Sequence, residues 1–296
     1  MNDCSLRRGV LRALIATCAL CGSMLVAQEP KSDAASADTG MKAWFAFYQR
    51  EAEKTYHFKL APGDTDLDLD PTPILRWTNP LEEGSIHGVV YVWRHKGRPV
   101  VIGQLFSYLN GKGGRVYCHA MHSLARDGET VTGRRDGTVF WTPDSPGVEM
   151  RDVPDAPTPA NDRRLRLIQM KAISRRFTAF TEEATRGKRV LRLLPTPLDR
   201  YPESTTNDAD GALFSLVVGN DPEVMLLLET GKNPMGTAVW KFALCRSTRS
   251  TCVAMLDERE TWRYDSADGK PNDQRSGYLS VHGIATLPLE PPDSKP

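Results

Sequence analysis

The chain has 296 residues, of which 40% are hydrophobic and 25% are charged, a composition typical of a globular protein and unlike that of a disordered chain or a coiled coil. Lys and Arg number 38 against 37 Asp and Glu, so the net charge of +1 offers no basic field for nucleic acid or anionic lipid. We expect one large or two modest domains and no nucleic-acid partner.

Residues 1–27 have the pattern of a secretory signal peptide. Arg7 and Arg8 precede an apolar run from Ala13 to Ala27, which is short for a membrane span and ends in a small residue. The sequence therefore predicts export to the periplasm or the extracellular space, with no transmembrane span after cleavage. The arginine pair also fits the twin-arginine motif, so the export route stays open.

Residues 28–40 are mostly Ser, Ala, Asp and Lys, which predicts a disordered leader. A first repeat unit is expected over residues 41–142. It begins with an amphipathic helix, because Trp44, Phe47 and Tyr48 recur at helical spacing, and the helix is expected to end near Lys54. Alternating apolar residues and turn signals then predict seven strands. These are His57 to Leu60, Asp66 to Asp70, Gly88 to Arg94, Val100 to Leu109, Arg115 to Leu124, Glu129 to Arg134 and Thr138 to Trp141.

Residues 143–162 contain five prolines, which predicts a linker between units. A second repeat unit is expected over residues 163–265, opening with a helix from Arg163 to Arg176. Its predicted strands are Phe177 to Ala184, Val190 to Leu194, Ala212 to Val218, Glu223 to Glu229, Ala238 to Arg246, Cys252 to Leu256 and Thr261 to Tyr264. Residues 266–296 are expected to hold a C-terminal strand and a disordered tail.

An internal duplication connects the two units. The segment from Leu67 to Trp77 recurs from Leu191 to Tyr201, with six of eleven positions identical. The match continues at a shift of 123 residues, for example at Gly88 and Gly211. We therefore expect an α+β fold of two similar units, each one helix packed on an antiparallel β meander.

Two arginines keep their identity in both copies and are each followed by an aromatic residue: Arg76 with Trp77, and Arg200 with Tyr201. A buried arginine that binds loop carbonyls would explain this, and so would a clamp for an anion or a carboxylate. These four residues are the candidate ligand-binding residues.

His119 and His122 are candidate metal ligands, with Cys118 beside them. On a strand, however, residues three apart point to opposite faces, and the second copy has the core residue Phe242 at the position of His119. A structural histidine is the simpler interpretation.

Cys118, Cys245 and Cys252 remain after removal of the signal peptide, and an odd number cannot pair fully within one chain. Cys245 and Cys252 flank a polar turn and form a candidate disulfide, with two free buried thiols as the alternative.

The motifs of serine hydrolases, zinc proteases, P-loop enzymes and dinucleotide-binding proteins are absent, and no cofactor is expected. The leading hypothesis is an exported, soluble, non-catalytic binding or structural module that binds a small molecule, a glycan or a protein. One alternative is a metal-dependent or hydrolytic enzyme using His119 and His122. Another is a glycan-binding protein that uses exposed Trp77, Trp93 or Trp141.

A resemblance to a known group is carried by several short segments. They are Arg76 to Pro80, Gly88 to Trp93, Arg98-Pro99, Arg192 to Leu198 and Asp210 to Phe214. Together these segments resemble an uncharacterised group of exported proteins from planctomycete-type bacteria. The resemblance spans about residues 42 to 265 and implies an exported, soluble protein; the group has no assigned activity, so no site residues follow from it.

Overall fold

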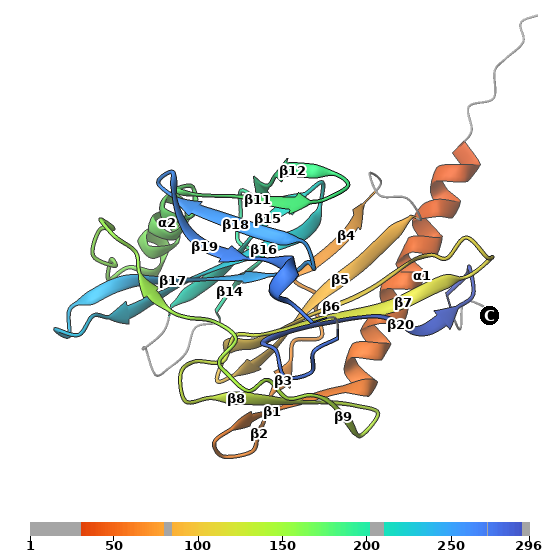
Figure 1. Cartoon of the computed structure of the whole chain (residues 1–296), viewed down its shortest axis with the longest axis horizontal. Helices are drawn as coiled ribbons and strands as arrows, with labels where there is room; N and C mark the ends of the chain where they lie inside the picture. The colour runs from red at the N-terminus through yellow and green to blue at the C-terminus, as the bar shows by residue number, and fades with distance from the viewer. Residues whose placement is uncertain (1–30, 80–84, 202–209, 271, 292–296) are drawn as a thin grey trace, which may run out of the picture.

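Four antiparallel sheets and two α-helices form the described part of the computed structural model (Figure 1), which comprises residues 31–79, 85–201, 210–270 and 272–291. The described residues form twenty strands and only two α-helices, so the expectation of an α+β fold is wrong. The fold is mainly β, and its sheets are arranged like the blades of a four-bladed propeller. The predicted signal peptide lies outside the described residues.

The first unit divides its strands between two sheets. One sheet has the order β2-β1-β8-β9, and the other has the order β20-β7-β6-β5-β3 with β4 also paired to β5. The elements of this unit are α1 (Lys31–Thr55), β1 (Tyr56–Ala61), β2 (Thr65–Asp66), β3 (Asp68–Leu69), β4 (Leu75–Asn79), β5 (Ile86–His95), β6 (Arg98–Leu109), β7 (Arg115–Ser123), β8 (Thr130–Arg135) and β9 (Thr138–Trp141).

The second unit repeats this plan. Its sheets have the orders β12-β11-β18-β19 and β10-β17-β16-β15-β13, with β14 also paired to β15. The remaining elements are β10 (Arg151–Asp152), α2 (Arg163–Ser174), β11 (Phe177–Glu183), β12 (Gly187–Val190), β13 (Arg192–Leu193), β14 (Asp199–Arg200), β15 (Gly211–Val218), β16 (Asp221–Lys232), β17 (Ala238–Arg246), β18 (Thr251–Leu256), β19 (Arg259–Tyr264), the short 3-10 helix η1 (Ser266–Asp268) and β20 (Tyr278–Leu287). Neither unit is thus a single meander under one helix, as the sequence had led us to expect.

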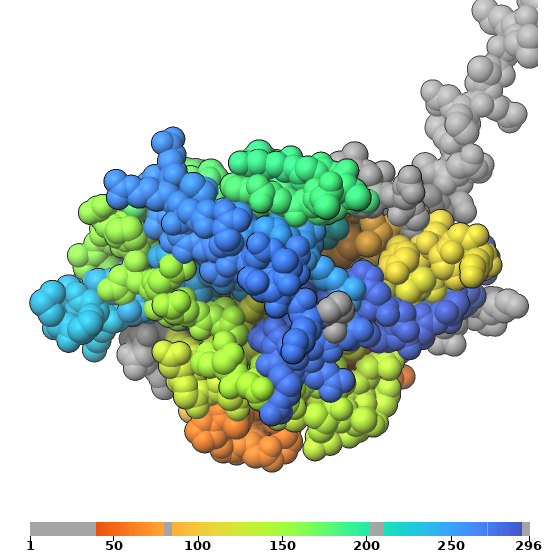
Figure 2. Space-filling model, in the orientation of Figure 1, coloured from red at the N-terminus to blue at the C-terminus, as the bar shows by residue number. Residues whose placement is uncertain are grey.

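The two units exchange strands. After β9 the chain crosses to the second unit, where Arg151 of β10 pairs with Phe242 of β17. After β19 it crosses back, and Val281 of β20 pairs with His119 of β7 (Figure 1). Phe242 and His119 occupy equivalent positions of the duplication, since 242 and 119 differ by 123. The exchange is therefore symmetric, and the C-terminal segment, blue in Figure 2, lies across the middle of that face of the molecule.

Three hydrophobic clusters hold the sheets together. One lies between the two sheets of the first unit and includes residues of α1, and a second joins the two sheets of the second unit with α2. The third lies between the two large sheets, where Val90 and Ile102 of the first unit share a core with Leu213 and Met225 of the second. Because both faces of each large sheet are covered, β5 and β15 are continuous apolar runs without the alternation of a half-exposed strand.

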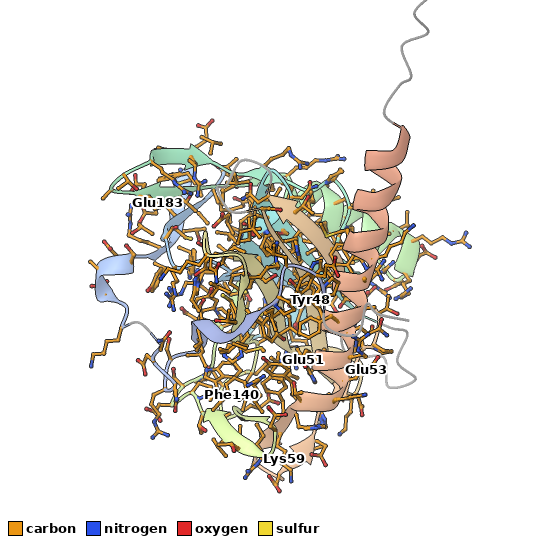
Figure 3. The ribbon with its side chains drawn as sticks, turned by 90° about the vertical axis from the view of Figure 1, so that its right-hand side faces the viewer. Tyr48, Glu51, Glu53, Lys59, Phe140 and Glu183 are labelled. Carbon is orange, nitrogen blue, oxygen red and sulfur yellow. The ribbon has the colours of Figure 1, made fainter. Side chains whose placement is uncertain are left out.

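The two helices pack against their own units. Figure 3 shows Tyr48 on the side of α1 that faces the strands, whereas Glu53 is exposed. The helix begins at Lys31, within residues 28–40, for which the sequence predicts a disordered leader. Asp162 caps α2 by accepting hydrogen bonds from the backbone N–H groups of Arg164 and Leu165. Within the described residues, neither helix is long and apolar enough to cross a membrane.

Candidate functional site

The conserved arginines lie against the helices of their own units. The guanidinium of Arg76 lies over the ring of Phe45 in α1, 5.5 Å from its centroid. Arg200 donates a hydrogen bond of 2.6 Å to the carbonyl of Arg163 in α2 and forms an ion pair of 2.8 Å with Asp210. Neither arginine lines the cavities described below, so the structure does not bring the two together into one clamp.

Trp77 and Tyr201, the aromatic partners of those arginines, are buried in the core between the large sheets, with exposed fractions of 2% each. Trp93 and Trp141 are also buried in the first unit. The hypothesis of a glycan-binding protein that uses exposed indoles of these three tryptophans is therefore wrong. When both faces of a sheet are covered, aromatic residues are buried in the core whichever face they point to.

The two histidines of β7 point to opposite faces of their sheet. His119 shares a hydrogen bond of 2.8 Å with the hydroxyl of Tyr56, and His122 bonds to the carbonyl of Ser123. Burial, helped by the charge of Arg135, lowers the pKa of His119 to about 3. The structure does not bring the two imidazoles together, and no cluster of three His, Cys, Asp or Glu suited to a metal occurs among the described residues.

The three cysteines of the described residues, Cys118, Cys245 and Cys252, are free and buried. The candidate disulfide between Cys245 and Cys252 is therefore not formed. Burial raises the pKa of Cys118 to about 11 and raises that of the other two thiols as well. Such thiols are inert packing residues.

A polar network in the first unit escaped the sequence analysis. The hydroxyl of Tyr48 bonds to Nδ1 of His87 at 3.0 Å and to Oγ of Ser107 at 2.7 Å, and Arg115 donates to the same Oγ at 2.8 Å. All four residues are almost entirely buried beneath α1. A ligand cannot reach them, and their hydrogen bonds fix the helix on the sheet.

Glu229 is a buried carboxylate at the interface between the units. Oε1 of Glu229 accepts from Nε of Arg98 at 2.8 Å and from the hydroxyl of Tyr201 at 2.6 Å, and its Oε2 accepts from Arg126 at 2.6 Å. Burial raises the pKa of Glu229, but the two arginines and the tyrosine lower it by a larger amount. The pKa of Glu229 therefore lies below its ordinary value. We call this group of four residues the closed half of the interface.

The equivalent half of the interface is a cavity of about 160 Å³. We call it the open half. It lies between β6 of the first unit, β16 of the second and β20, and its walls include Trp77, Phe106, Asp221, Glu223 and Arg249.

The duplication shows why one half is closed and the other open. At equivalent positions, Trp77 replaces Tyr201, Phe106 replaces Glu229 and Asp221 replaces Arg98, whereas Arg249 keeps the arginine of position 126. The open half therefore has Phe106 at the position of the carboxylate of Glu229, and its own carboxyl groups are those of Asp221 and Glu223. Phe106 contacts Trp77 there, with ring centroids 6.0 Å apart.

Three buried polar atoms on the walls of the open half have no hydrogen-bond partner: Nε1 of Trp77, Nε2 of Gln104 and Oε2 of Glu223. The exposed fractions of these residues are 2%, 5% and 5%. A buried polar group without a partner costs about 1–3 kcal/mol, and the closed half carries one such atom as well, Nη2 of Arg98.

Glu223 has an unusual protonation equilibrium. Burial, reinforced by the neighbouring carboxylate of Asp221, raises the pKa of Glu223 to about 8. His282, also on the cavity wall, has its pKa lowered to about 4 by burial and by Arg249. Near neutral pH, Glu223 is therefore mainly an uncharged carboxyl that can both donate and accept, and His282 is neutral.

No family model, curated protein or solved structure matches this chain. The resemblance to an exported planctomycete group therefore stays a prediction, and the candidate site is argued from its own geometry.

Of the predicted site residues, only Trp77 lines the open half. Gln104, Asp221 and Glu223 have different residues at the equivalent positions of the other copy, so identity between the copies does not mark them as site residues. The sequence does show that the two copies differ here: at equivalent positions, 123 residues apart, Arg98 corresponds to Asp221 and Phe106 corresponds to Glu229. Such changes of charge and polarity at equivalent core positions indicate that one half has a separate role.

Proposed function

We propose that this chain is an exported, non-catalytic binding module that takes a small polar ligand into the open half of its interface. The supporting observation is that three residues lining the cavity, Trp77, Gln104 and Glu223, each carry a buried polar atom without a hydrogen-bond partner. Natural proteins rarely leave buried donors unpaired, and binding sites are a recurrent exception.

The walls of the cavity specify the ligand's chemistry. Nε1 of Trp77 and Nε2 of Gln104 are donors, so the ligand presents acceptors to them. The uncharged carboxyl of Glu223 can donate to or accept from a third group. The ring of Phe106 supplies an apolar wall, which favours a flat or apolar face on the ligand. A volume of about 160 Å³ limits the bound part to a small metabolite or one moiety of a larger molecule.

A thermal-shift screen of the full chain tests the proposal. The library contains amino acids, amines, nucleosides and monosaccharides, and hits are measured by calorimetry. Gln104→Leu copies the residue at the equivalent position, Leu227, and removes one unpaired donor. We expect this variant to weaken binding of a genuine ligand roughly tenfold, as loss of a hydrogen bond from a buried donor predicts.

The chain supplies its own control for closure of the site. Trp77→Tyr, Phe106→Glu and Asp221→Arg together copy Tyr201, Glu229 and Arg98 into the open half. Because Arg249 already occupies the position of Arg126, the variant rebuilds the closed arrangement. We expect it to fold and to bind none of the hits; equal binding by this variant and the native chain would place the ligand elsewhere.

A further inference from the structure

A second recess adjoins the open half and is lined by basic residues. Its volume is about 100 Å³, and it shares Arg249, Tyr278 and Ser280 with the open half. Arg246 and Lys270 line this recess and do not line the open half. The two spaces thus have different chemistry on either side of Arg249.

Arg246 is held by aromatic rings. Its guanidinium carbon lies 3.3 Å from the ring centroid of Tyr264 and 4.3 Å from that of Tyr278. A guanidinium over aromatic rings keeps its N–H donors in its own plane, where they can bind an oxygen ligand. Burial lowers the pKa of Arg246, and the groups that raise it are Tyr278, Tyr264 and Cys252, with no carboxylate among them.

Neither arginine of the recess is neutralised by an ion pair among the described residues. Arg249 donates to Oδ1 of Asn272 at 2.8 Å and to the carbonyl of Ser280, both uncharged acceptors. The acidic residue of the lining is Asp273, whose Oδ1 accepts from the backbone N–H of Arg275. Three cations against one carboxylate leave the recess with a net positive charge.

The backbone is fitted closely around the site. A Cβ on Gly269 would overlap the hydroxyl of Tyr264, so a larger residue there would require the tip of this tyrosine to shift. The first unit keeps Arg126 at the position of Arg249 but lacks Arg246 and Tyr278. Ser123 stands at the position equivalent to Arg246. Val148 is equivalent to Tyr278, because each lies three residues before the residue of its crossing strand, Arg151 or Val281, that pairs with the other unit. The repeated fold therefore does not require these side chains.

We propose that this recess binds an oxyanion, the phosphate, sulfate or carboxylate group of a ligand, through the guanidiniums of Arg246 and Arg249 and the ammonium of Lys270. An oxyanion supplies the acceptors and the negative charge that the recess lacks, and arginine binds such groups with paired N–H donors. The site is distinct from the open half, because Arg246 and Lys270 belong to the recess alone. This proposal does not depend on the proposed function of the open half.

Calorimetry with inorganic phosphate, sulfate and acetate at constant ionic strength tests this site, and the three ions show which oxyanion it prefers. We expect saturable 1:1 binding of at least one ion to the full chain. Arg246→Met should weaken that binding roughly tenfold or more, because it removes charge-assisted hydrogen bonds. Arg259→Met removes an exposed arginine of the same unit outside the recess and should change the affinity less than twofold.

Circular dichroism confirms the fold of each variant. Should Arg246→Met not fold, Lys270→Met, at an exposed position, replaces it and should weaken binding at least threefold. The proposal is overturned if none of the three ions binds the native chain, or if binding is the same in the folded recess variant and in Arg259→Met. Loss of ion binding in Gln104→Leu as well would assign the ion to the open half and would also overturn it.

Discussion

Gly147 and Gly277 touch where the two exchanged segments cross: a Cβ on Gly277 would lie 3.0 Å from the Cα of Gly147. Each glycine stands four residues before the residue of its segment, Arg151 or Val281, that pairs with the opposite unit. The contact therefore joins equivalent positions of the duplication.

Gly147→Ala should destabilise the protein by about 3 kcal/mol, because its Cβ would lie 1.9 Å from the carbonyl oxygen of Ser123 and the backbone must move. Urea denaturation measures the change. Gly40→Ala is the matched control, since nothing lies within 4 Å of that Cβ and alanine favours the helix. Equal stabilities of the two variants would show that the crossing point is loose.

Glu229→Gln should lower the free energy of unfolding by about 3 kcal/mol at pH 7, because it leaves the buried guanidinium of Arg98 without its counter-charge. The folded-state pKa of Glu229 lies below its ordinary value, so its contribution is present above the unfolded pKa and is lost as the pH falls through the folded pKa. The difference between variant and native chain should therefore shrink in acid. Glu260→Gln, in an exposed pair with Arg263, should have little effect at any pH.

Glu223→Gln should make the protein more stable at alkaline pH. The pKa of Glu223 rises from 4.5 to about 8 on folding, so the folded state retains a proton that the unfolded state releases. The stability of the native chain should decrease as the pH rises between these two values, whereas that of the variant should not show this decrease. Denaturation from pH 5 to 9 should show an advantage of the variant that grows by up to about 4 kcal/mol. An advantage that does not change with pH would mean that Glu223 is ionised in the folded protein.

The thiols of Cys118, Cys245 and Cys252 should resist alkylation in the folded protein, because all three are buried and their pKa values are raised. Mass spectrometry after iodoacetamide treatment at pH 8 should find them unmodified until urea unfolds the chain. A mass lower by two hydrogens on the peptides of Cys245 and Cys252 would instead show the disulfide that the structure lacks.

The local pattern of the sequence predicted many elements well. Thr138 to Trp141 and Ala238 to Arg246 coincide with β9 and β17, and the repeat itself is confirmed. These succeeded because turn residues and apolar runs mark strand ends within a few positions. The strand β10 has only two residues, too few for such a pattern.

The division into four sheets could not be read from the sequence. Val281 of β20 pairs with His119 across more than half of the chain, and nothing near either residue specifies the other as partner. The α+β expectation failed for the same reason, since it assumed that each unit pairs only with itself. The open half was missed because it lies where the copies differ, at Phe106 and Asp221.

The most direct test of the account is a calorimetric titration of the strongest hit from the metabolite screen into two proteins, the native chain and the variant carrying Trp77→Tyr, Phe106→Glu and Asp221→Arg. We predict 1:1 binding to the native chain and no measurable heat with the variant, whose own carboxylate occupies the site. Binding of equal affinity to both proteins would contradict it.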